Sequence, residues 1–372
     1  MNKKEMFQKW EKEILFPILQ ETVFIMQKEV QQNIEQIQKT ICAEIEKLFF
    51  KAVKEQCEQK INYITFHIMR QDILEGIYQY HLFLYDEDWY LKKGKEIGVL
   101  DSHIIYKYYN QFYNEVLLQS NTYRSIFSIP EMEMFTMKQL NIFHYFFVEI
   151  LRYAMNELTE SDAYYKLKKA EHLEIQSGEY YEPCEKLYQQ DTEIDYGKWK
   201  RQFLKQEDKN FCFVDLKGID LKGISANDMD LRYADVRQSD LQGIDLKGSN
   251  LQGVRFQKSN LKQSNLEQTV LNYACFDGAD LQGACFDDAV TELDNILFML
   301  KIYSAYCYTS FKGCCLKNAS FKNAVLNYAD FREADIENVD FTNAVLEKCI
   351  FSKQQLKQIV LTEQQKNQII IA

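Results

Sequence analysis

A five-residue period is the feature that most constrains how this chain can fold. In the stretch SDLQGIDLKGSNLQG, residues 239–253, three leucines are evenly spaced at Leu241, Leu246 and Leu251. Asp or Asn precedes each leucine, and Gly stands two positions after it. An α-helix repeats about every 3.6 residues and a strand every 2 residues, so neither element alone explains this spacing.

The same register extends over most of the C-terminal part of the chain. A large apolar residue recurs every five residues from Phe211 to Phe286, weakened only at Ala226, and again from Phe311 to Phe351. A small or modest residue stands two positions before most of these large residues. Each pentapeptide therefore offers one small and one large inward position. Such units cannot bury an apolar face alone, which predicts that they stack into a solenoid.

Individual units resemble the pentapeptide-repeat family. The units GADLQ, YADVR, YADFR and EADIE carry the resemblance, which covers about 140 residues in register. Membership would imply a right-handed, quadrilateral β-helix with four units, or twenty residues, in each coil. We therefore predict an α + β-solenoid chain, with the β-helix over residues 201–353 and a C-terminal helical cap over residues 354–372.

The first two hundred residues show helical spacing instead. Apolar residues from Met26 to Ala52 recur at a mean step of about 3.7 residues, which predicts one long helix that begins after Pro17. Further helix starts are predicted at Ser102, Ser128 and Ser161. Residues 1–200 are therefore predicted to form an all-helical, bundle-like domain.

Composition narrows the functional classes. The net charge is −11, and both halves are mildly acidic, at −7 for residues 1–210 and −4 for residues 211–361. An acidic chain of this kind is not expected to bind nucleic acid directly. No apolar run reaches the length of a membrane span, and the N-terminus lacks a signal-peptide pattern, so we expect a cytoplasmic protein without a membrane partner. The ten cysteines form no C-x-x-C pair and are expected to be free thiols.

Coils of twenty residues would stack acidic side chains in outward columns. Asp220, Asp240 and Asp280 fall in one column, and Asp215 and Asp235 fall in another. These carboxylates either accept hydrogen bonds from the turn backbone, as Asp does in Asx turns, or form an acidic stripe that binds a basic partner. We keep all five as candidate partner-binding residues.

An interruption at about 288–310 is the second informative feature. Phe286 and Phe311 lie 25 residues apart, which predicts a twenty-residue insertion, Val290 to Thr309, that leaves both the five- and twenty-residue phases intact. Its apolar residues follow helical spacing and are further partner-binding candidates: Leu293, Ile296, Leu297 and Leu300. The insertion is either a helix packed on the solenoid wall or a recognition loop.

Nothing in the sequence indicates catalysis. No H-E-x-x-H, Gly-rich phosphate loop or kinase motif occurs. His144 and Glu149, five apart on one predicted helix, are poorly placed as metal ligands, and such a histidine is expected to be a hydrogen-bonded core residue. Cys314 and Cys349 fall at small inward positions, where Cys acts as a small hydrophobe. We predict no enzymatic activity, no catalytic or metal site and no cofactor.

These observations favour a non-catalytic scaffold or regulatory protein that binds a protein partner. The alternative is mimicry of duplex DNA, because some members of the family bind DNA gyrase or topoisomerase IV and confer quinolone resistance or self-immunity. Interleaved bases weaken this alternative, since Lys217, Lys222 and Arg232 stand among the acids. The apolar end, Ile369 to Ile371, predicts either a cover for the last coil or a homodimer formed through the C-terminal cap.

Overall fold

The computed structural model describes residues 3–55, 60–120, 127–291 and 308–372 of the chain. Among these residues the chain divides into two compact units, one that extends to Leu187 and one that begins at Tyr188. We describe each unit by itself. The predicted boundary at about residue 200 therefore lies slightly too far along the chain.

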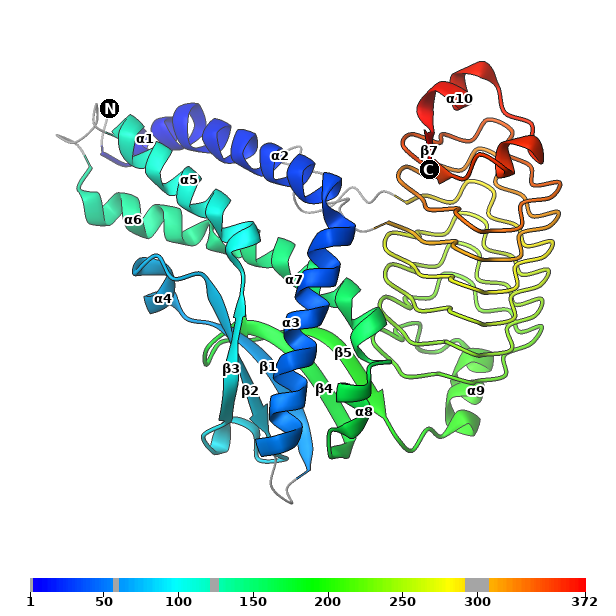
Figure 1. Cartoon of the computed structure of the whole chain (residues 1–372), viewed down its shortest axis with the longest axis horizontal. Coiled ribbons are helices and arrows are strands. Elements are labelled where there is room, and N and C mark those ends of the chain that lie inside the picture. The colour runs from blue at the N-terminus through cyan, green and yellow to red at the C-terminus, as the bar shows by residue number, and fades with distance from the viewer. Residues whose placement is uncertain (1–2, 56–59, 121–126, 292–307) are drawn as a thin grey trace. The chain divides into compact units, whose positions relative to one another are not determined.

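The first unit contains helices and a sheet (Figure 1). Its helical segments are α1 (Lys3–Trp10), the π-helical η1 (Glu11–Leu15), α2 (Phe16–Gln32), α3 (Ile34–Glu55), α4 (Arg70–Leu74), the 3-10 turn η2 (Trp89–Leu91), α5 (His103–Ser120), α6 (Ile129–Lys138), α7 (Leu140–Leu158) and α8 (Asp162–Lys166). Its strands are β1 (Ile61–Ile68), β2 (Gln79–Tyr85), β3 (Lys95–Asp101), β4 (Lys169–Glu179) and the start of β5 (Glu185–Asp191). From Tyr188 onward, β5 belongs to the second unit.

The sheet makes the prediction of an all-helical domain wrong. Its strand order is β3-β2-β1-β4-β5, with β1 antiparallel to β2 and parallel to β4. The strand β1, INYITFHI, is rich in β-branched and aromatic residues and is buried over most of its length. Because both faces of this strand are covered, apolar residues occupy both, and the alternation that identifies a half-exposed strand is weak.

The predicted helix starts at Ser102, Ser128 and Ser161 are correct. The predicted start after Pro17 is wrong, because Pro17 lies within α2 and helical segments precede it from Lys3, and the long helix is broken. Asn33 leaves helical geometry between α2 and α3, with φ −117° and ψ 13°. The apolar stripe continues across this break, so spacing alone could not reveal it. Ser128 forms a capping box with Glu131 at the start of α6, and the Ser161 side chain accepts a hydrogen bond from Tyr164 N at the start of α8.

The second unit begins with α9 (Tyr196–Lys205) and continues as a β-solenoid (Figure 1). Parallel bridges join residues twenty apart, as in Asp215↔Asp235 and Asp220↔Asp240, so one coil holds four pentapeptides. The amide of Leu216 donates to Asp235 O at 2.7 Å, and the amide of Gly218 donates to Arg237 O at 2.9 Å. Every coil therefore supplies the backbone partners of the next, as strands do in a parallel sheet.

The interior is filled by the predicted large and small residues. Leu246 and Leu251 are at most 1% exposed, as the five-residue register requires. The phenylalanines stack in columns, with ring centroids 4.7 Å apart for Phe256 and Phe276, and 5.0 Å apart for Phe276 and Phe311. The residue two after each centre has a positive φ, 70° at Gly248, which explains why Gly recurs at this position.

The insertion is fifteen residues long, and the prediction of twenty is wrong. Val290 still bridges Val270 in normal register, whereas Cys275 bridges Ser310, thirty-five residues away. The offset exceeds one coil by three pentapeptides. Thr291 occupies an inward position and belongs to the solenoid, since its amide donates to Val325 O at 2.8 Å. Residues 292–307, including the predicted helix, lie outside the described part of the chain.

Two glutamines make matching contacts at the C-terminal end of the solenoid. This end comprises β6 (Ile350–Phe351), η5 (Gln355–Lys357), α10 (Glu363–Gln368) and β7 (Ile370–Ile371). Gln355 Nε2 donates to Phe331 O and Ala334 O at 2.6 and 2.7 Å. Gln365 Nε2 donates in the same way to Phe341 O and Ala344 O, which follow the acceptors of Gln355 by ten residues in the sequence. The strand β7 pairs in parallel with β6.

Candidate functional site

The outward columns of the solenoid hold the charged residues predicted from the sequence. Bridges place Asp220 beside Asp240, and residue 260 in turn connects Asp240 to Asp280 in the same column. Each of the three carboxylates accepts a hydrogen bond from the amide two residues later, at 3.1, 3.2 and 3.4 Å respectively. These contacts are those of Asx turns, so the structural interpretation of these aspartates is correct.

Lysines lie next to this column. Lys200 Nζ lies 3.4 Å from Asp220 Oδ2, and Lys262 Nζ lies 2.9 Å from Asp280 Oδ2. The backbone amide of Lys222 and then Lys200 lower the pKa of Asp220. Asp240 instead accepts a hydrogen bond from Asn260 Nδ2 at 3.0 Å. The column is therefore mixed in charge and polarity.

A geometric rule underlies part of this pairing. Three lysines contact an acid eighteen residues later, which is one coil up and two residues back: Lys262 to Asp280, Lys317 to Asp335 and Lys322 to Asp340, at 2.9, 3.3 and 3.3 Å. All six side chains are about 40–50% exposed. Exposed pairs of this type add little stability, but they cancel charge along the face.

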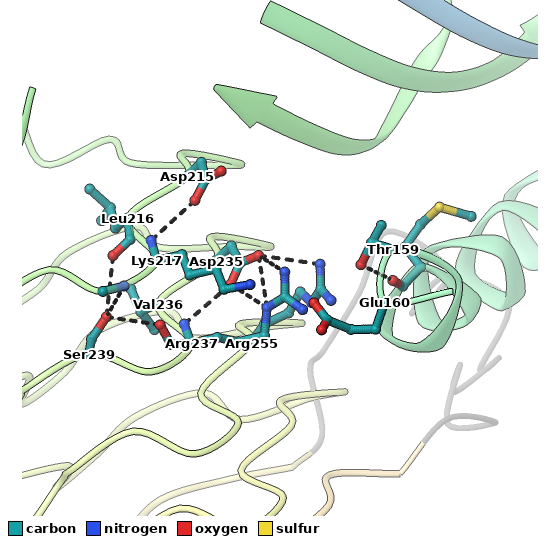
Figure 2. Close-up of polar contacts among 12 residues, drawn as sticks. Thr159, Glu160, Asp215, Leu216, Lys217, Asp235, Val236, Arg237, Ser239 and Arg255 are labelled. Atoms are coloured by element: carbon teal, nitrogen blue, oxygen red, sulfur yellow. Dashed lines mark hydrogen bonds and ion pairs between the residues drawn. The ribbon is translucent and has the colours of Figure 1, made fainter. Parts of the chain in front are cut away.

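The second predicted column differs, because Asp215 and Asp235 are only 6% and 2% exposed. Figure 2 shows Asp235 facing two arginine side chains. Arg237 forms a bidentate contact with Asp235, with Nε–Oδ1 at 2.8 Å and Nη2–Oδ2 at 2.6 Å. Arg255 Nη1 lies 3.4 Å from Asp235 Oδ2. The expectation that these two aspartates belong to an exposed acidic stripe is therefore wrong.

Burial and neighbouring charge shift the pKa values of Asp235 and Asp215 in opposite directions. Burial works to raise the pKa of Asp235, but Arg255 and Arg237 outweigh it and hold that pKa below its usual range. Burial and the adjacent charge of Asp235 raise the pKa of Asp215 to about 6. The Arg255 guanidinium also lies 5.2 Å from the ring centre of Tyr188, in a cation–π contact. This cluster is a buried ionic network.

A sequence signal for such pairs exists and was missed. The tripeptide Asp-x-Arg occurs within three repeat units. In each unit the arginine donates hydrogen bonds from two nitrogen atoms to the carboxylate of the aspartate two residues earlier. The pairs are Asp230–Arg232, Asp235–Arg237 and Asp330–Arg332. A fixed bidentate geometry of this kind suits arginine and carboxylate better than it suits lysine.

A polar groove of about 400 Å³ lies near the C-terminal end of the solenoid. Its lining is mainly acidic and amide side chains, with one lysine: Lys317, Glu333, Asp335, Glu337, Ser352, Gln354, Gln355 and Gln358, together with Ala334. Lys317 contacts Glu337 at 2.9 Å across this lining. The repeat pattern did not indicate the groove, because the C-terminal segment that forms one wall is not a pentapeptide.

The remaining candidates are distributed as follows. Leu293, Ile296, Leu297 and Leu300 lie outside the described residues. His144 is the hydrogen-bonded core residue that we expected, with Nδ1 2.6 Å from Tyr80 OH, and burial lowers its pKa to about 4.

Within the described residues no cluster of His, Cys, Asp or Glu has a geometry suited to metal binding. No helix there is long and apolar enough to cross a membrane.

Comparison with known proteins agrees with this geometry. The model of a family described as pentapeptide repeats matches residues 210–248, 249–288 and 309–353, in eight copies. This part of the chain belongs to the pentapeptide-repeat family. The two matched blocks that end at residue 288 and begin at residue 309 flank the insertion in the pentapeptide-repeat domain. No curated protein matches the chain.

Several solved structures are similar to the pentapeptide-repeat domain. A pentapeptide repeat protein from the cyanobacterium Cyanothece 51142 is 18% identical, with 42% of this chain and 99% of that chain covered and a TM-score of 0.19. QnrB1, described as a plasmid-mediated fluoroquinolone resistance protein, is 13% identical, with 44% and 86% covered and a TM-score of 0.28. HetL of Nostoc sp. strain PCC 7120, described as involved in heterocyst differentiation regulation, is 22% identical, with 42% and 94% covered and a TM-score of 0.14. At these TM-scores the similarities carry no argument about function.

Proposed function

We propose that the chain is a non-catalytic scaffold or regulatory protein whose pentapeptide-repeat domain binds a protein partner through its outward columns. The domain would be a right-handed, four-sided β-helix, closed at its C-terminal end by η5 and α10. The observation that carries the proposal is the division between a filled interior and an exterior of regularly spaced, paired charges. An interior packed with Leu and Phe leaves no room for a substrate, so recognition falls to the faces.

Face-specific charge reversal tests this proposal. Lys222, Lys262 and Lys317 lie in one corner column, each two coils from the next, and their replacement by Glu would make that face acidic. Lys247 and Lys322 lie in the next corner column and provide a matched control. Crosslinking in the native host, followed by mass spectrometry, should lose a partner for one variant and retain it for the other. Equal partner sets for both variants and the wild type would count against recognition by these faces.

A second candidate function is topoisomerase protection by DNA mimicry, which the column of Asp220, Asp240 and Asp280 favours. Mimicry of duplex DNA would require a continuous acidic face on this domain. The lysines beside Asp220 and Asp280, and the burial of Asp235 between arginines, count against it. We rank this function below the scaffold.

A supercoiling assay decides between the two functions. Purified protein should leave gyrase activity, and its inhibition by quinolones, unchanged at low micromolar concentration. If protection occurs, replacement of Asp220, Asp240 and Asp280 by Asn should weaken it. Protection at sub-micromolar concentration that these three substitutions abolish would reverse our ranking.

We also propose that the C-terminal end forms a homodimer contact. Ile370 and Ile371 of β7 are 47% and 55% exposed, and an exposed apolar strand at an edge is prone to pair with another chain. Light scattering on the wild type and on an Ile370→Ser/Ile371→Ser variant should show a dimer and a monomer respectively. A wild type that stays monomeric at high concentration would exclude the contact.

A further inference from the structure

A histidine of the first unit lies between two carboxylates. His81, on β2, has its Nε2 2.8 Å from Asp72 Oδ2 and its Nδ1 2.8 Å from Glu96 Oε1. Asp72 belongs to α4 and Glu96 to β3, so the contacts join three elements. We call His81, Asp72 and Glu96 the His81 cluster. The side chains of His81 and Asp72 are 15% and 19% exposed, and that of Glu96 is 48% exposed.

The number of protons required follows from the geometry. A neutral imidazole has one N–H donor and one bare nitrogen, whereas an imidazolium has two donors. Ionised carboxylates only accept hydrogen bonds. With a carboxylate against each ring nitrogen, a neutral ring would direct a lone pair at one of them. The two 2.8 Å contacts of His81 with Asp72 and Glu96 are therefore both hydrogen bonds only when His81 carries both protons.

Among the described residues, His81 is the only cation that pairs with Asp72 or Glu96. His67, paired with His81 across β1 and β2, is fully buried, and burial lowers its pKa to about 4, so it is neutral. Arg70 of α4 is directed at Glu179 of β4, with Nε 2.6 Å from Oε2. On the strand of His81 itself, Gln79 Nε2 donates to Asp72 Oδ2 at 3.0 Å and lies 3.3 Å from His81 Nε2.

Aromatic rings also lie near the His81 cluster. Phe83 lies on the same strand, with its ring centre 6.5 Å from that of His81. Tyr180 follows β4 and packs against Phe83 with ring centres 5.5 Å apart. The hydrogen bond with Tyr181 raises the pKa of this phenol most, and burial and the charge of Glu96 raise it further. The pKa of His81 agrees with a doubly protonated ring. Burial works to lower this pKa, but the contacts with Asp72 and Glu96 outweigh burial and raise it.

Glu96 occupies a special place in the sheet. The strand β3 is an edge of the described sheet, and its pairing with β2 shifts register next to Glu96, because Leu82 pairs with Gly98 while Phe83 pairs with Glu96. One residue, Ile97, is therefore extra in β3, as in a β-bulge. A bulge interrupts the backbone ladder, so side-chain contacts carry more of the attachment of an edge strand at that point.

We propose that the His81 cluster attaches the bulged edge strand β3 to the sheet through hydrogen bonds that depend on the protonation of His81. When His81 loses a proton, one carboxylate contact is lost. Glu96 is the more exposed of the two carboxylates, at 48% against 19% for Asp72, so water most readily replaces the contact with Glu96, and this contact is the one that opens. The sheet edge is then held at the bulge by fewer contacts, and β3 exchanges its amide protons more readily.

The direction of the pH effect follows from linkage. We call the state in which His81 contacts both carboxylates closed, and the state in which the contact with Glu96 is broken open. The closed state binds the His81 proton more tightly than the open state, whose histidine has the ordinary pKa of about 6.5. Closure is therefore favoured fully below about pH 6.5 and weakens as the pH rises through the higher pKa of the closed state. Between these two values the equilibrium constant for opening should rise by up to about tenfold per pH unit, and above them it should stay constant.

Hydrogen exchange on the full-length protein tests the proposal. Protection of β3 amides, corrected for the intrinsic pH dependence of exchange, is measured at intervals from about pH 5.5 to pH 8.5, and NMR titration of His81 gives its pKa. In the wild type, β3 protection should fall as His81 deprotonates, whereas β1 protection should not. In Glu96→Gln the amide group can accept from, or donate to, either form of the ring, so the pH dependence should disappear.

His172→Gln is a matched control, because His172 also contacts a carboxylate, Glu174 at 3.2 Å, but this carboxylate lies on the same strand, β4, and not on β3. This variant should behave like the wild type at β3. If Glu96→Gln fails to fold, Asp72→Asn provides the same loss of one carboxylate. A His81 pKa of 6.5 or below, β3 protection that does not change with pH, or the same pH dependence in Glu96→Gln as in the wild type would each overturn the proposal.

Discussion

Two deletions of different length test whether the insertion is fifteen or twenty residues long. Removal of residues 292–306 joins Thr291 to residue 307 and leaves one complete pentapeptide before Phe311. Tyr308 then takes the position two after an inward residue, where Tyr233 and Tyr328 have φ of 60° and 63°. Phe311 keeps its stacking on Phe276 at 5.0 Å. The solenoid should close with its ring columns intact.

Removal of residues 290–309 preserves the five-residue phase but shortens the coil by one unit. Phe276 would then face Leu316, and Phe286 would face Leu326, so the ring pairs Phe276–Phe311 and Phe286–Phe321, at 5.0 and 4.6 Å, are lost. An aromatic pair contributes about 0.5–1.5 kcal/mol beyond its burial, which amounts to about 1–3 kcal/mol for two pairs.

Two hydroxyl contacts are lost as well in the longer deletion. Thr291 Oγ1 donates to Asn327 O at 3.0 Å, and Thr309 Oγ1 donates to Leu271 O at 2.7 Å. Each contributes about 1 kcal/mol, so the longer deletion should be less stable than the shorter one by about 3–5 kcal/mol. Both variants lack residues 292–306, so any contribution of that segment cancels in the comparison.

Thermal unfolding followed by far-ultraviolet circular dichroism measures this difference. For a domain of this size about 1 kcal/mol shifts the Tm by roughly 2–4 °C, so the two Tm values should differ by roughly 6–20 °C. Equal Tm values, or a longer deletion that is the more stable of the two, would refute the thirty-five-residue offset and the packing argument built on it.

Three further perturbations address the interior and the buried charges. Leu246→Lys places a charge in the filled interior and should unfold the domain, whereas Gln242→Lys, on the outside, should cost under about 0.5 kcal/mol; equal Tm values would contradict the register. Asp235→Asn leaves the guanidinium of Arg237 buried without its carboxylate and should cost about 3–5 kcal/mol in urea titrations. Because the pKa of Asp215 is raised to about 6 from the ordinary Asp value, the folded state prefers its neutral form, and stability falls as the pH rises between about 4 and 6. Asp215→Asn should therefore raise the Tm above pH 6 and have no effect below about pH 4, and a variant that lowers the Tm at pH 7 would contradict this.

The sequence predicts the solenoid well because its register is local. Each pentapeptide repeats the same small and large inward positions, so the burial of Leu246 follows from five residues of context. The length of the insertion does not follow, because fifteen and twenty are both multiples of five. Only contacts between residues of different coils, such as that of Cys275 with Ser310, distinguish them.

Local sequence context also fails to predict which acidic column is buried. Asp215 and Asp220 stand in nearly identical pentapeptides, yet Asp215 is buried while the Asp220 side chain is 65% exposed. The difference depends on what covers each column, and the ring of Tyr188, which lies outside the repeats, belongs to the buried one. In the first unit, helical spacing located most helices but concealed the sheet, since strands covered on both faces lose their alternation.

The contacts at the two ends of the pentapeptide-repeat domain leave the number of its middle coils free to vary. At one end Phe203 of α9 stacks on Phe211 with ring centres 4.3 Å apart, and at the other Gln355 and Gln365 occupy carbonyl groups of the last coils. Neither set of contacts involves the middle coils. Gain or loss of one twenty-residue coil would therefore move the two ends apart or together by one strand spacing, about 4.8 Å, and leave both ends unchanged. The reach of such a domain can change in fixed steps, one duplication at a time.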